Sequence, residues 1–157
     1  YKYNVQKMDI ELDKTYSKDQ KLYLEIQYNA KPEASQDSIF MANTKKGLYF
    51  INPLGNIPGK PQQIWTHGET NTSSKWFPTI DAPNQKSTQE IYITVDEQFK
   101  TLSNGKLIYS KSNNNGTRTD YWKMDKPHAP YLFMMAGGDF SVVEDRWNDI
   151  HVNYYVE

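Results

Sequence analysis

The stretch "EIYITV", Glu90–Val95, alternates polar and apolar residues with a period of two. Ile91, Ile93 and Val95 therefore lie on one face of an extended chain. Further strand-like segments are "MDIEL" (8–12), "KLYLEIQY" (21–28), "PYLFMMAG" (130–137), "FSVVED" (140–145) and "IHVNYYVE" (150–157). No segment keeps a helical period. The sequence therefore predicts an all-β fold, a saddle-like β-sandwich of two packed sheets that are mostly antiparallel or mixed.

Turn signals separate these segments. "TLSNGKLIY", Thr101–Tyr109, predicts a tight hairpin, because Asn104 and Gly105 suit the positive dihedral angles of a two-residue turn. "SNNNGTRTDYWKM" (112–124) predicts a longer hairpin loop that leads into a strand. The polar segment 32–46 predicts a long loop, and residues 84–88 are compatible with one helical turn.

The chain of 157 residues has the length of one domain. Residues 87–157 predict strands in regular antiparallel order, whereas residues 1–86 predict isolated strands and a long loop. The chain begins with Tyr1, and its first strands have no identifiable neighbour. We therefore expect a fragment of a larger protein, without the first strands of its domain. An unpaired edge near residues 8–28 would be covered by a neighbouring chain or left mobile, and it could support self-association.

Charge and composition exclude several classes of protein. The 18 basic and 19 acidic residues give a net charge of −1, with no basic stripe for nucleic acid or an anionic membrane. The apolar runs are too short to span a bilayer. Because there is no cysteine, disulfides, thiolate metal sites and cysteine nucleophiles are excluded.

Aromatic residues make up 14% of the chain, and two interpretations compete. Aromatic side chains suit half-buried strands. They also form stacking surfaces, so a carbohydrate-binding β-sandwich remains an alternative, with stacking residues Trp65, Trp76, Trp122 and Trp147.

Residues that could carry chemistry are few. The zinc motif H-E-x-x-H is absent, and His67 with Glu69 supplies too few ligands for zinc. The position of His128 between two prolines predicts that it lies in a turn. The position of His151 in the last strand-like segment predicts that it faces solvent. Asp81 and Asp139 are open to two interpretations, a pair of carboxylates or two separate turn caps. The chain has no phosphate-binding glycine loop and no G-x-S-x-G nucleophile motif.

The stretch "IWTHGETNTSSKWFPTIDAP", Ile64–Pro83, sets a carboxylate directly after a strand. Gly68 has no side chain, so another molecule could come close to Glu69. With Trp65 and Trp76 as walls, Glu69 would form a receptor for a cation. The alternative is an exposed loop glutamate.

The run "GKPQQIWTHGET…WFPTIDAPNQKSTQEIYITV", with "KGLYF", "TLSNGKL" and "KPHAPYLFMMAGGDF", resembles the zinc aminopeptidases of the aminopeptidase N family. That family includes the leukotriene-hydrolysing aminopeptidases. The chain is similar to the later part of their amino-terminal β-domain. The resemblance implies that Glu69 binds the α-amino group of a peptide and that His67, where the family has glutamine, lines the pocket for the first side chain. Structural support would come from Phe77, Pro78, Asp81 and Pro83.

The resemblance also implies a parent enzyme that removes amino-terminal residues from peptides. Its zinc, its H-E-x-x-H ligands and its general base would lie in a catalytic domain of the same polypeptide. This chain would bind no metal and would be inactive alone. Residues 1–86 would contain the substrate-facing segment. Export to the periplasm or cell exterior is favoured over the cytoplasm. The alternatives are a non-catalytic module that binds carbohydrate or protein, and a family member kept for protein interaction.

Overall fold

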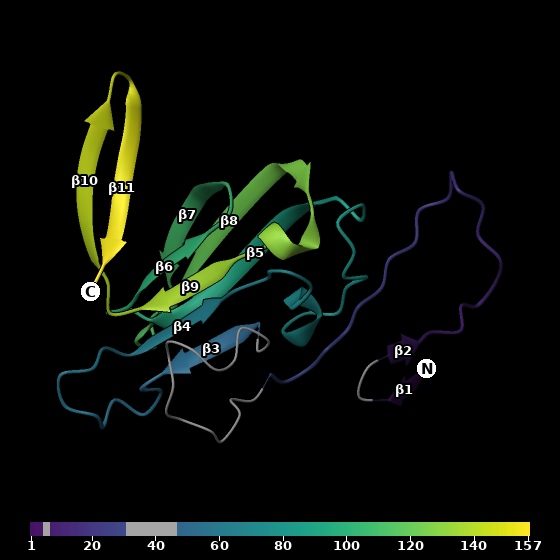
Figure 1. Cartoon of the computed structure of the whole chain (residues 1–157), viewed down its shortest axis with the longest axis horizontal. Helices are drawn as coiled ribbons and strands as arrows, with labels where there is room; N and C mark the ends of the chain where they lie inside the picture. The colour runs from purple at the N-terminus through teal and green to yellow at the C-terminus, as the bar shows by residue number, and fades with distance from the viewer. Residues whose placement is uncertain (5–6, 31–46) are drawn as a thin grey trace.

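The computed structural model describes residues 1–4, 7–30 and 47–157 (Figure 1). Its strands are β1 (Lys2–Asn4), β2 (Lys7–Asp9), β3 (Leu48–Ile51), β4 (Gln63–Thr66), β5 (Ser87–Asp96), β6 (Lys100–Ser103), β7 (Lys106–Ser112), β8 (Thr117–His128), β9 (Met135–Gly138), β10 (Ser141–Trp147) and β11 (Ile150–Val156). Two single 3₁₀ turns, η1 (Ser73–Lys75) and η2 (Pro130–Leu132), are the helical elements of the described residues. The all-β prediction is confirmed. None of the described residues forms a helix long and apolar enough to cross a membrane.

The strands form two larger sheets and two separate hairpins. One sheet has the order β3-β4-β9-β6, and the other has the order β5-β8-β7. The hairpins are β1-β2 and β10-β11, and every pairing among the described strands is antiparallel. The predicted loop at 32–46 lies outside the described residues.

One face of β5 is turned towards the core, as the alternation in its sequence predicted. Ile93 is buried, and Ile91 and Val95 are half-buried on the same face, whereas Tyr92 and Thr94 are exposed on the other. The buried apolar side chains of the described residues are Trp76, Ile93, Trp122, Ala129 and Phe133. The core therefore lies between the inner faces of the two larger sheets and under η1 and η2.

A buried polar network joins the two sheets at β6, β7 and β8. Arg118 forms an ion pair with Asp120 through Nε and Nη2, at 2.9 and 3.0 Å. Thr101 and Ser110 each donate a hydroxyl hydrogen bond of 2.6 Å to the same carboxylate. Trp122 Nε1 donates to Thr101 Oγ1 at 3.0 Å. Burial raises the pKa of Asp120, but these hydrogen bonds and the charge of Arg118 outweigh it, so the pKa lies below its ordinary value.

The predicted hairpin at Asn104–Gly105 is wrong. β6 pairs with β9 and β7 pairs with β8, so the turn between β6 and β7 carries the chain from one sheet to the other. Gly105 has a φ of +87°, and a Cβ there would lie 1.9 Å from the Lys123 carbonyl oxygen. The glycine therefore serves this change of sheet, whereas the next turn, between β7 and β8, is the predicted longer hairpin loop.

The strand predicted at residues 21–28 is also wrong. These residues belong to no strand, and Leu22, Leu24 and Tyr28 are exposed. Of "MDIEL", residues 8 and 9 lie in β2. Alternation favours an extended backbone, but a strand also needs a neighbour for its hydrogen bonds. No described strand lies beside residues 21–28.

Candidate functional site

The segment that carries Glu69 begins where β4 ends. After Thr66, the backbone N–H of His67 donates to the Gly47 carbonyl at 2.9 Å. The chain then turns, with Thr72 N donating to the Gly68 carbonyl at 3.0 Å and Thr72 Oγ1 to the His67 carbonyl at 2.5 Å. These bonds fix the backbone on both sides of Glu69.

Gly68 fits this segment closely against the chain before β9. A Cβ at Gly68 would lie 2.2 Å from the Tyr131 carbonyl oxygen and 2.7 Å from Ser73 Oγ. Ser73, fully buried, donates its hydroxyl hydrogen to the Pro130 carbonyl at 2.7 Å. In this structure, therefore, the group that lies close to Gly68 is the chain's own η2 turn.

The side chains of His67 and Glu69 are exposed. Within residues 1–4, 7–30 and 47–157, neither side chain forms an ion pair or a hydrogen bond. The Glu69 backbone carbonyl accepts a weak bond of 3.4 Å from Thr72 Oγ1. The structure therefore combines a fixed backbone with an available carboxylate.

The aromatic residues of this segment have partners of their own. Trp76 is buried against Phe77, with ring centroids 4.5 Å apart, and Phe77 lies 5.4 Å from Phe133. Trp65 stacks on Tyr49, directly opposite in β3, at 4.2 Å. Trp76 thus anchors the segment to the core, and Trp65 covers the β3–β4 pair.

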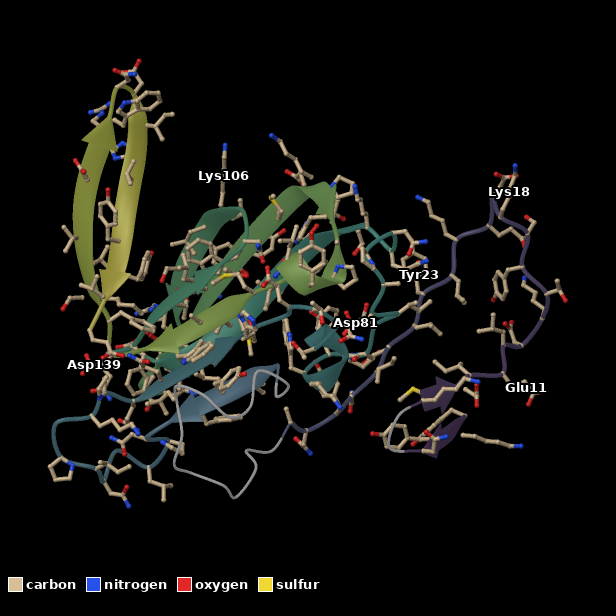
Figure 2. The ribbon with its side chains drawn as sticks, in the orientation of Figure 1. Glu11, Lys18, Tyr23, Asp81, Lys106 and Asp139 are labelled. Carbon is tan, nitrogen blue, oxygen red and sulfur yellow. The ribbon has the colours of Figure 1, made fainter. Side chains whose placement is uncertain are left out.

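Of the other residues predicted to support the site, Asp81 contacts η1, whereas the two prolines are exposed. Asp81 Oδ2 accepts a hydrogen bond of 2.9 Å from the Ser74 backbone N–H, so this carboxylate holds η1. Pro78 and Pro83 are exposed. Asp81 and Asp139 point into separate regions, at opposite ends of the molecule's central part in Figure 2. They do not form a pair of carboxylates.

The prediction for His128 is wrong, whereas His151 is exposed on β11 as predicted. His128 is the last residue of β8 and is buried. Its ring stacks on Phe133 at 4.3 Å, and its Nδ1 donates to the Lys126 carbonyl at 3.0 Å. Alternation along β8 does not predict this burial, because Lys126, of the same parity, is exposed and the register with β5 shifts before His128.

The described residues offer no metal centre. They contain no group of three or more histidine, cysteine, aspartate or glutamate side chains that could hold an ion. These residues therefore do not fit a zinc ion, which the resemblance places in another domain of the parent enzyme.

An open cavity of about 350 Å³ is lined by residues of β3, β4, β5 and β9 and of the loops beside them. It contains none of the predicted site residues, and its lining comprises Phe50, Pro53, Gln62, Gln63, Ile64, Val95, Asp96, Phe99, Gly137 and Gly138.

The four tryptophans considered for carbohydrate binding do not share one surface. Trp76 and Trp122 are buried, Trp65 is half-buried on Tyr49, and Trp147 is exposed at the far end of the β10–β11 hairpin. An aromatic cluster that sequence reasoning missed lies on the outer face of the β5-β8-β7 sheet. Tyr92 and Tyr121 stack in parallel there at 4.5 Å, so each ring covers a face of the other.

Comparison with known proteins decides the family. The family model of the peptidase M1 N-terminal domain matches residues 1–132. The chain belongs to this family. The M1 N-terminal domain thus includes both the Glu69 segment and the buried Asp120 network. The match ends at η2, before β9 and the β10–β11 hairpin.

Individual relatives of this M1 N-terminal domain fall into two groups. Transcription initiation factor TFIID subunit 2 of Danio rerio is 28% identical over 106 residues, and that of Gallus gallus is 26% identical over 106 residues. Each alignment covers 66% of this chain and 9% of the relative, so the chain spans about a tenth of their length. A two-domain M1 zinc metallopeptidase of known structure aligns with a TM-score of 0.51 and 16% identity, over 58% of this chain and 22% of that one. This likeness shows the fold.

Proposed function

We propose that this M1 N-terminal domain supplies the carboxylate that binds the substrate's α-ammonium group in a zinc-dependent aminopeptidase. The parent enzyme would remove amino-terminal residues from peptides. Zinc, held by another domain of the same polypeptide, would polarise the first peptide bond. This chain alone would bind the peptide's amino terminus weakly and would not cleave it.

The observation that carries the proposal is the unpaired carboxylate of Glu69 on a fixed backbone. A carboxylate already paired with a lysine or arginine would need to break that pair before binding an amine. Glu69 has no such partner among the described residues. Its backbone, in contrast, is held by the bonds from Thr72 to Gly68 and His67.

Charge pairing explains how Glu69 would act. An ammonium donates charge-assisted hydrogen bonds to a carboxylate, and these bonds strengthen when the second domain excludes water. Fixing the amine also places the first peptide bond at a set distance from it, so binding energy is used for orientation. An enzyme built this way would select free amino termini.

His67 would lie next to the first side chain of the peptide. It follows Thr66 and is exposed, with no side-chain hydrogen bond among the described residues. The histidine side chain is planar and shorter than the glutamine that the aminopeptidase N family has at this position. We propose that it changes the preference for the first residue of the peptide. Restoring glutamine with His67→Gln should alter relative KM values among first residues more than kcat.

The test is Glu69→Gln in the complete parent protein, which keeps the side-chain shape and removes the charge. Losing one member of a desolvated ion pair costs about 2–5 kcal/mol. That corresponds to a fall of about 30- to 4000-fold in kcat/KM for peptides with a free amino terminus. Thr70→Val, at the adjacent exposed position, is the control and should change kcat/KM less than about threefold. An unchanged preference for free over acetylated peptides in an active Glu69→Gln enzyme would disprove the role.

The relatives' names favour a second candidate function. Two of the curated relatives are subunits of a transcription initiation factor. The alternative is therefore a non-catalytic M1 N-terminal domain that serves protein assembly. An H-E-x-x-H motif elsewhere in the parent polypeptide, together with peptidase activity, would favour the enzyme. A parent without that motif, recovered in a stable complex with other proteins, would favour assembly.

A further inference from the structure

The sequence contains two Asn-Gly pairs, and both lie at turns. Asn104–Gly105 joins β6 to β7, and Asn115–Gly116 lies in the loop between β7 and β8. In such a pair the glycine nitrogen can attack the carbonyl carbon of the asparagine side chain, because glycine has no side chain that shields its nitrogen or restricts its φ. The folded chain decides which pair reacts, since the attack needs movement of both residues.

The structure holds the Asn104 pair firmly. Asn104 Nδ2 donates to the Leu132 carbonyl at 2.9 Å, and Asn104 Oδ1 accepts from the Met134 backbone N–H at 2.7 Å. A Cβ on Gly105 would lie 1.9 Å from the Lys123 carbonyl oxygen. Attack on the Asn104 side chain would therefore break two hydrogen bonds and displace a closely packed backbone.

The Asn115 pair has room to move. Asn115 and Gly116 are exposed, and nothing lies within 4 Å of a Cβ added to Gly116, which has a φ of +83°. Within the part of the chain that the structure describes, neither Asn115 Nδ2 nor the Gly116 backbone N–H has a hydrogen-bond partner. The nitrogen that attacks and the nitrogen that leaves are therefore both untied.

The oxygen of the Asn115 side chain, in contrast, is held by Thr117. The Thr117 backbone N–H donates to Asn115 Oδ1 at 3.1 Å, and the Thr117 hydroxyl donates to it at 2.7 Å. The ring that the backbone bond closes includes the Gly116 nitrogen, so the side-chain carbonyl group is kept beside this nitrogen. Negative charge develops on Oδ1 during the attack, and two donors aimed at this oxygen stabilise the charge as an oxyanion hole does.

We propose that Asn115 is a site of self-catalysed modification. The Gly116 nitrogen attacks the Asn115 side chain and converts it, through a cyclic imide, to aspartate and isoaspartate. Thr117 promotes the reaction by stabilising the oxygen that gains charge. Asn104, with the same neighbouring glycine, stays intact in the folded chain. The proposal is independent of the proposed function.

The bond changes balance with water as the other reactant. The Gly116 nitrogen gives its proton to hydroxide and forms a bond to Asn115 Cγ. The bond from Cγ to Nδ2 then breaks, and Nδ2 takes up a proton and leaves as ammonia. Water opens the imide ring at either of its two carbonyl carbons. Opening at one carbon gives aspartate, and opening at the other gives isoaspartate, in which the main chain runs through the former side chain.

The modification changes both charge and backbone at the tip of the β7–β8 loop. A carboxylate replaces a neutral amide, which lowers the formal net charge of −1 by one. The Gly116 carbonyl accepts from the Glu97 backbone N–H at 3.0 Å, and this bond ties the tip to the turn between β5 and β6. Isoaspartate adds a carbon to the backbone directly before Gly116, so it shifts the carbonyl that Glu97 contacts.

The test follows both asparagines in one sample of the chain. The folded chain is incubated at mildly alkaline pH and then digested at acid pH. Mass spectrometry of the peptides that contain Asn104 and Asn115 measures the exchange of amide for carboxylate, and fragmentation distinguishes isoaspartate from aspartate. A second sample, incubated in concentrated urea, gives the rates for both pairs without the fold.

Two variants isolate the role of the hydroxyl. Thr117→Val removes the hydroxyl that donates to Asn115 and keeps the backbone N–H and the branched shape. Thr119→Val is the matched control, because it lies two positions along the same strand and its hydroxyl bonds to Asn113 and Thr94 instead.

We expect Asn115 to convert at least about fivefold faster than Asn104 in the folded chain, since two hydrogen bonds must break at Asn104. In urea that ratio should shrink towards one. Thr117→Val should slow the conversion of Asn115 about fivefold, because a hydrogen bond to a charged oxygen is stronger than one to a neutral oxygen. Thr119→Val should leave the rate within about twofold of the original.

Four results would overturn the proposal. Equal conversion of Asn104 and Asn115 in the folded chain would mean that the fold does not select the site. An Asn115 that stays intact while both pairs convert in urea would mean that the fold protects it. Equal rates in the Thr117→Val and Thr119→Val chains would remove the role of the hydroxyl. Aspartate without isoaspartate would mean that water attacks the side chain directly, without the cyclic imide.

Discussion

Two regions of the molecule differ in how far their side chains find partners within the chain. One is the buried Asp120 network at β6, β7 and β8, and the other is the β10–β11 hairpin. In the interior, Asp120 receives hydrogen bonds from three other side chains and is 3% exposed. In the hairpin, Trp147 is 66% exposed, and Val143, Ile150 and Tyr154 are exposed as well. The interior therefore satisfies its polar groups within the chain, whereas the hairpin leaves most of its side chains exposed.

The largest effect should come from breaking the interior. Asp120→Ala leaves the Arg118 side chain, which is 18% exposed, without its carboxylate and removes the acceptor of Thr101 and Ser110, and breaking a buried ion pair typically costs about 3–5 kcal/mol. We expect a loss of that size in the free energy of unfolding of this chain, measured by urea denaturation. Thr94→Ala, on the exposed face of the same sheet, is the control and should cost less than about 1 kcal/mol. Similar losses in both variants would show that the network does not hold the sheets together.

The same carboxylate should make stability depend on pH. Burial acts to raise the pKa of Asp120, but the hydrogen bonds from Arg118, Ser110 and Thr101 lower it below the unfolded value. Its stabilising contribution is therefore full above the unfolded pKa of about 4 and is lost as the pH falls through the lower, folded pKa. Urea midpoints between pH 2 and pH 6 should fall more steeply for the wild-type chain than for Asp120→Asn. Parallel curves would contradict this assignment.

The change of sheet between β6 and β7 should be the next most sensitive point. Gly105→Ala places a Cβ 1.9 Å from the Lys123 carbonyl oxygen in a left-handed conformation, with φ of +87°. The left-handed conformation alone costs about 1–2 kcal/mol, and the clash adds to it. Gly59→Ala is the matched control, since Gly59 has a φ of +72° and nothing within 4 Å of its added Cβ. If unfolding energies show equal losses for the two variants, the turn is not packed as described.

This turn also shows why parts of the fold could not be predicted from the sequence. Asn104–Gly105 is a local signal, and it correctly indicates a turn. Which strands pair on either side depends on distant residues, and here β9 and β8 take the two partners. The alternation in β5 predicted burial correctly, because the inner face of that strand packs in one core whatever the order of its neighbours. Residues 21–28 have the same alternation but no neighbouring strand among the described residues.

In the candidate site, too, features of one continuous stretch could be predicted, whereas contacts between distant segments could not. Glu69 and its exposed position could be inferred from "THGET" and from resemblance to a family, because both are properties of a continuous stretch. The burial of Ser73 against Pro130, and the contact of Gly68 with Tyr131, join segments about 60 residues apart. The Asp120 network likewise combines residues from three strands. No pattern within a single stretch predicts such contacts.

The link between the site segment and the interior should have a moderate effect. Ser73→Ala removes the hydroxyl that donates to Pro130 and leaves a buried carbonyl oxygen without that partner. Because the Pro130 carbonyl still accepts from the Phe133 backbone N–H at 3.0 Å, losing this one hydrogen bond should cost about 0.5–1.5 kcal/mol. Ser74→Ala is the control, because Ser74 is exposed and its bond to Asp81 uses the backbone N–H, which the substitution keeps. Hydrogen exchange of residues 67–76 should accelerate in the Ser73 variant only. Unchanged exchange would mean that Trp76 and Gly68 hold the segment without this bond.

The smallest effect should come from the hairpin, measured in this chain alone. Trp147→Ser removes a large side chain of the β10–β11 hairpin that is 66% exposed in this chain. The free energy of unfolding should change by less than about 0.5 kcal/mol, as for other exposed substitutions. The same replacement in the interior, Trp122→Ser, removes a side chain that is 6% exposed and should cost about 3–5 kcal/mol. A large loss for Trp147→Ser would mean that this side chain packs against the rest of the chain in solution.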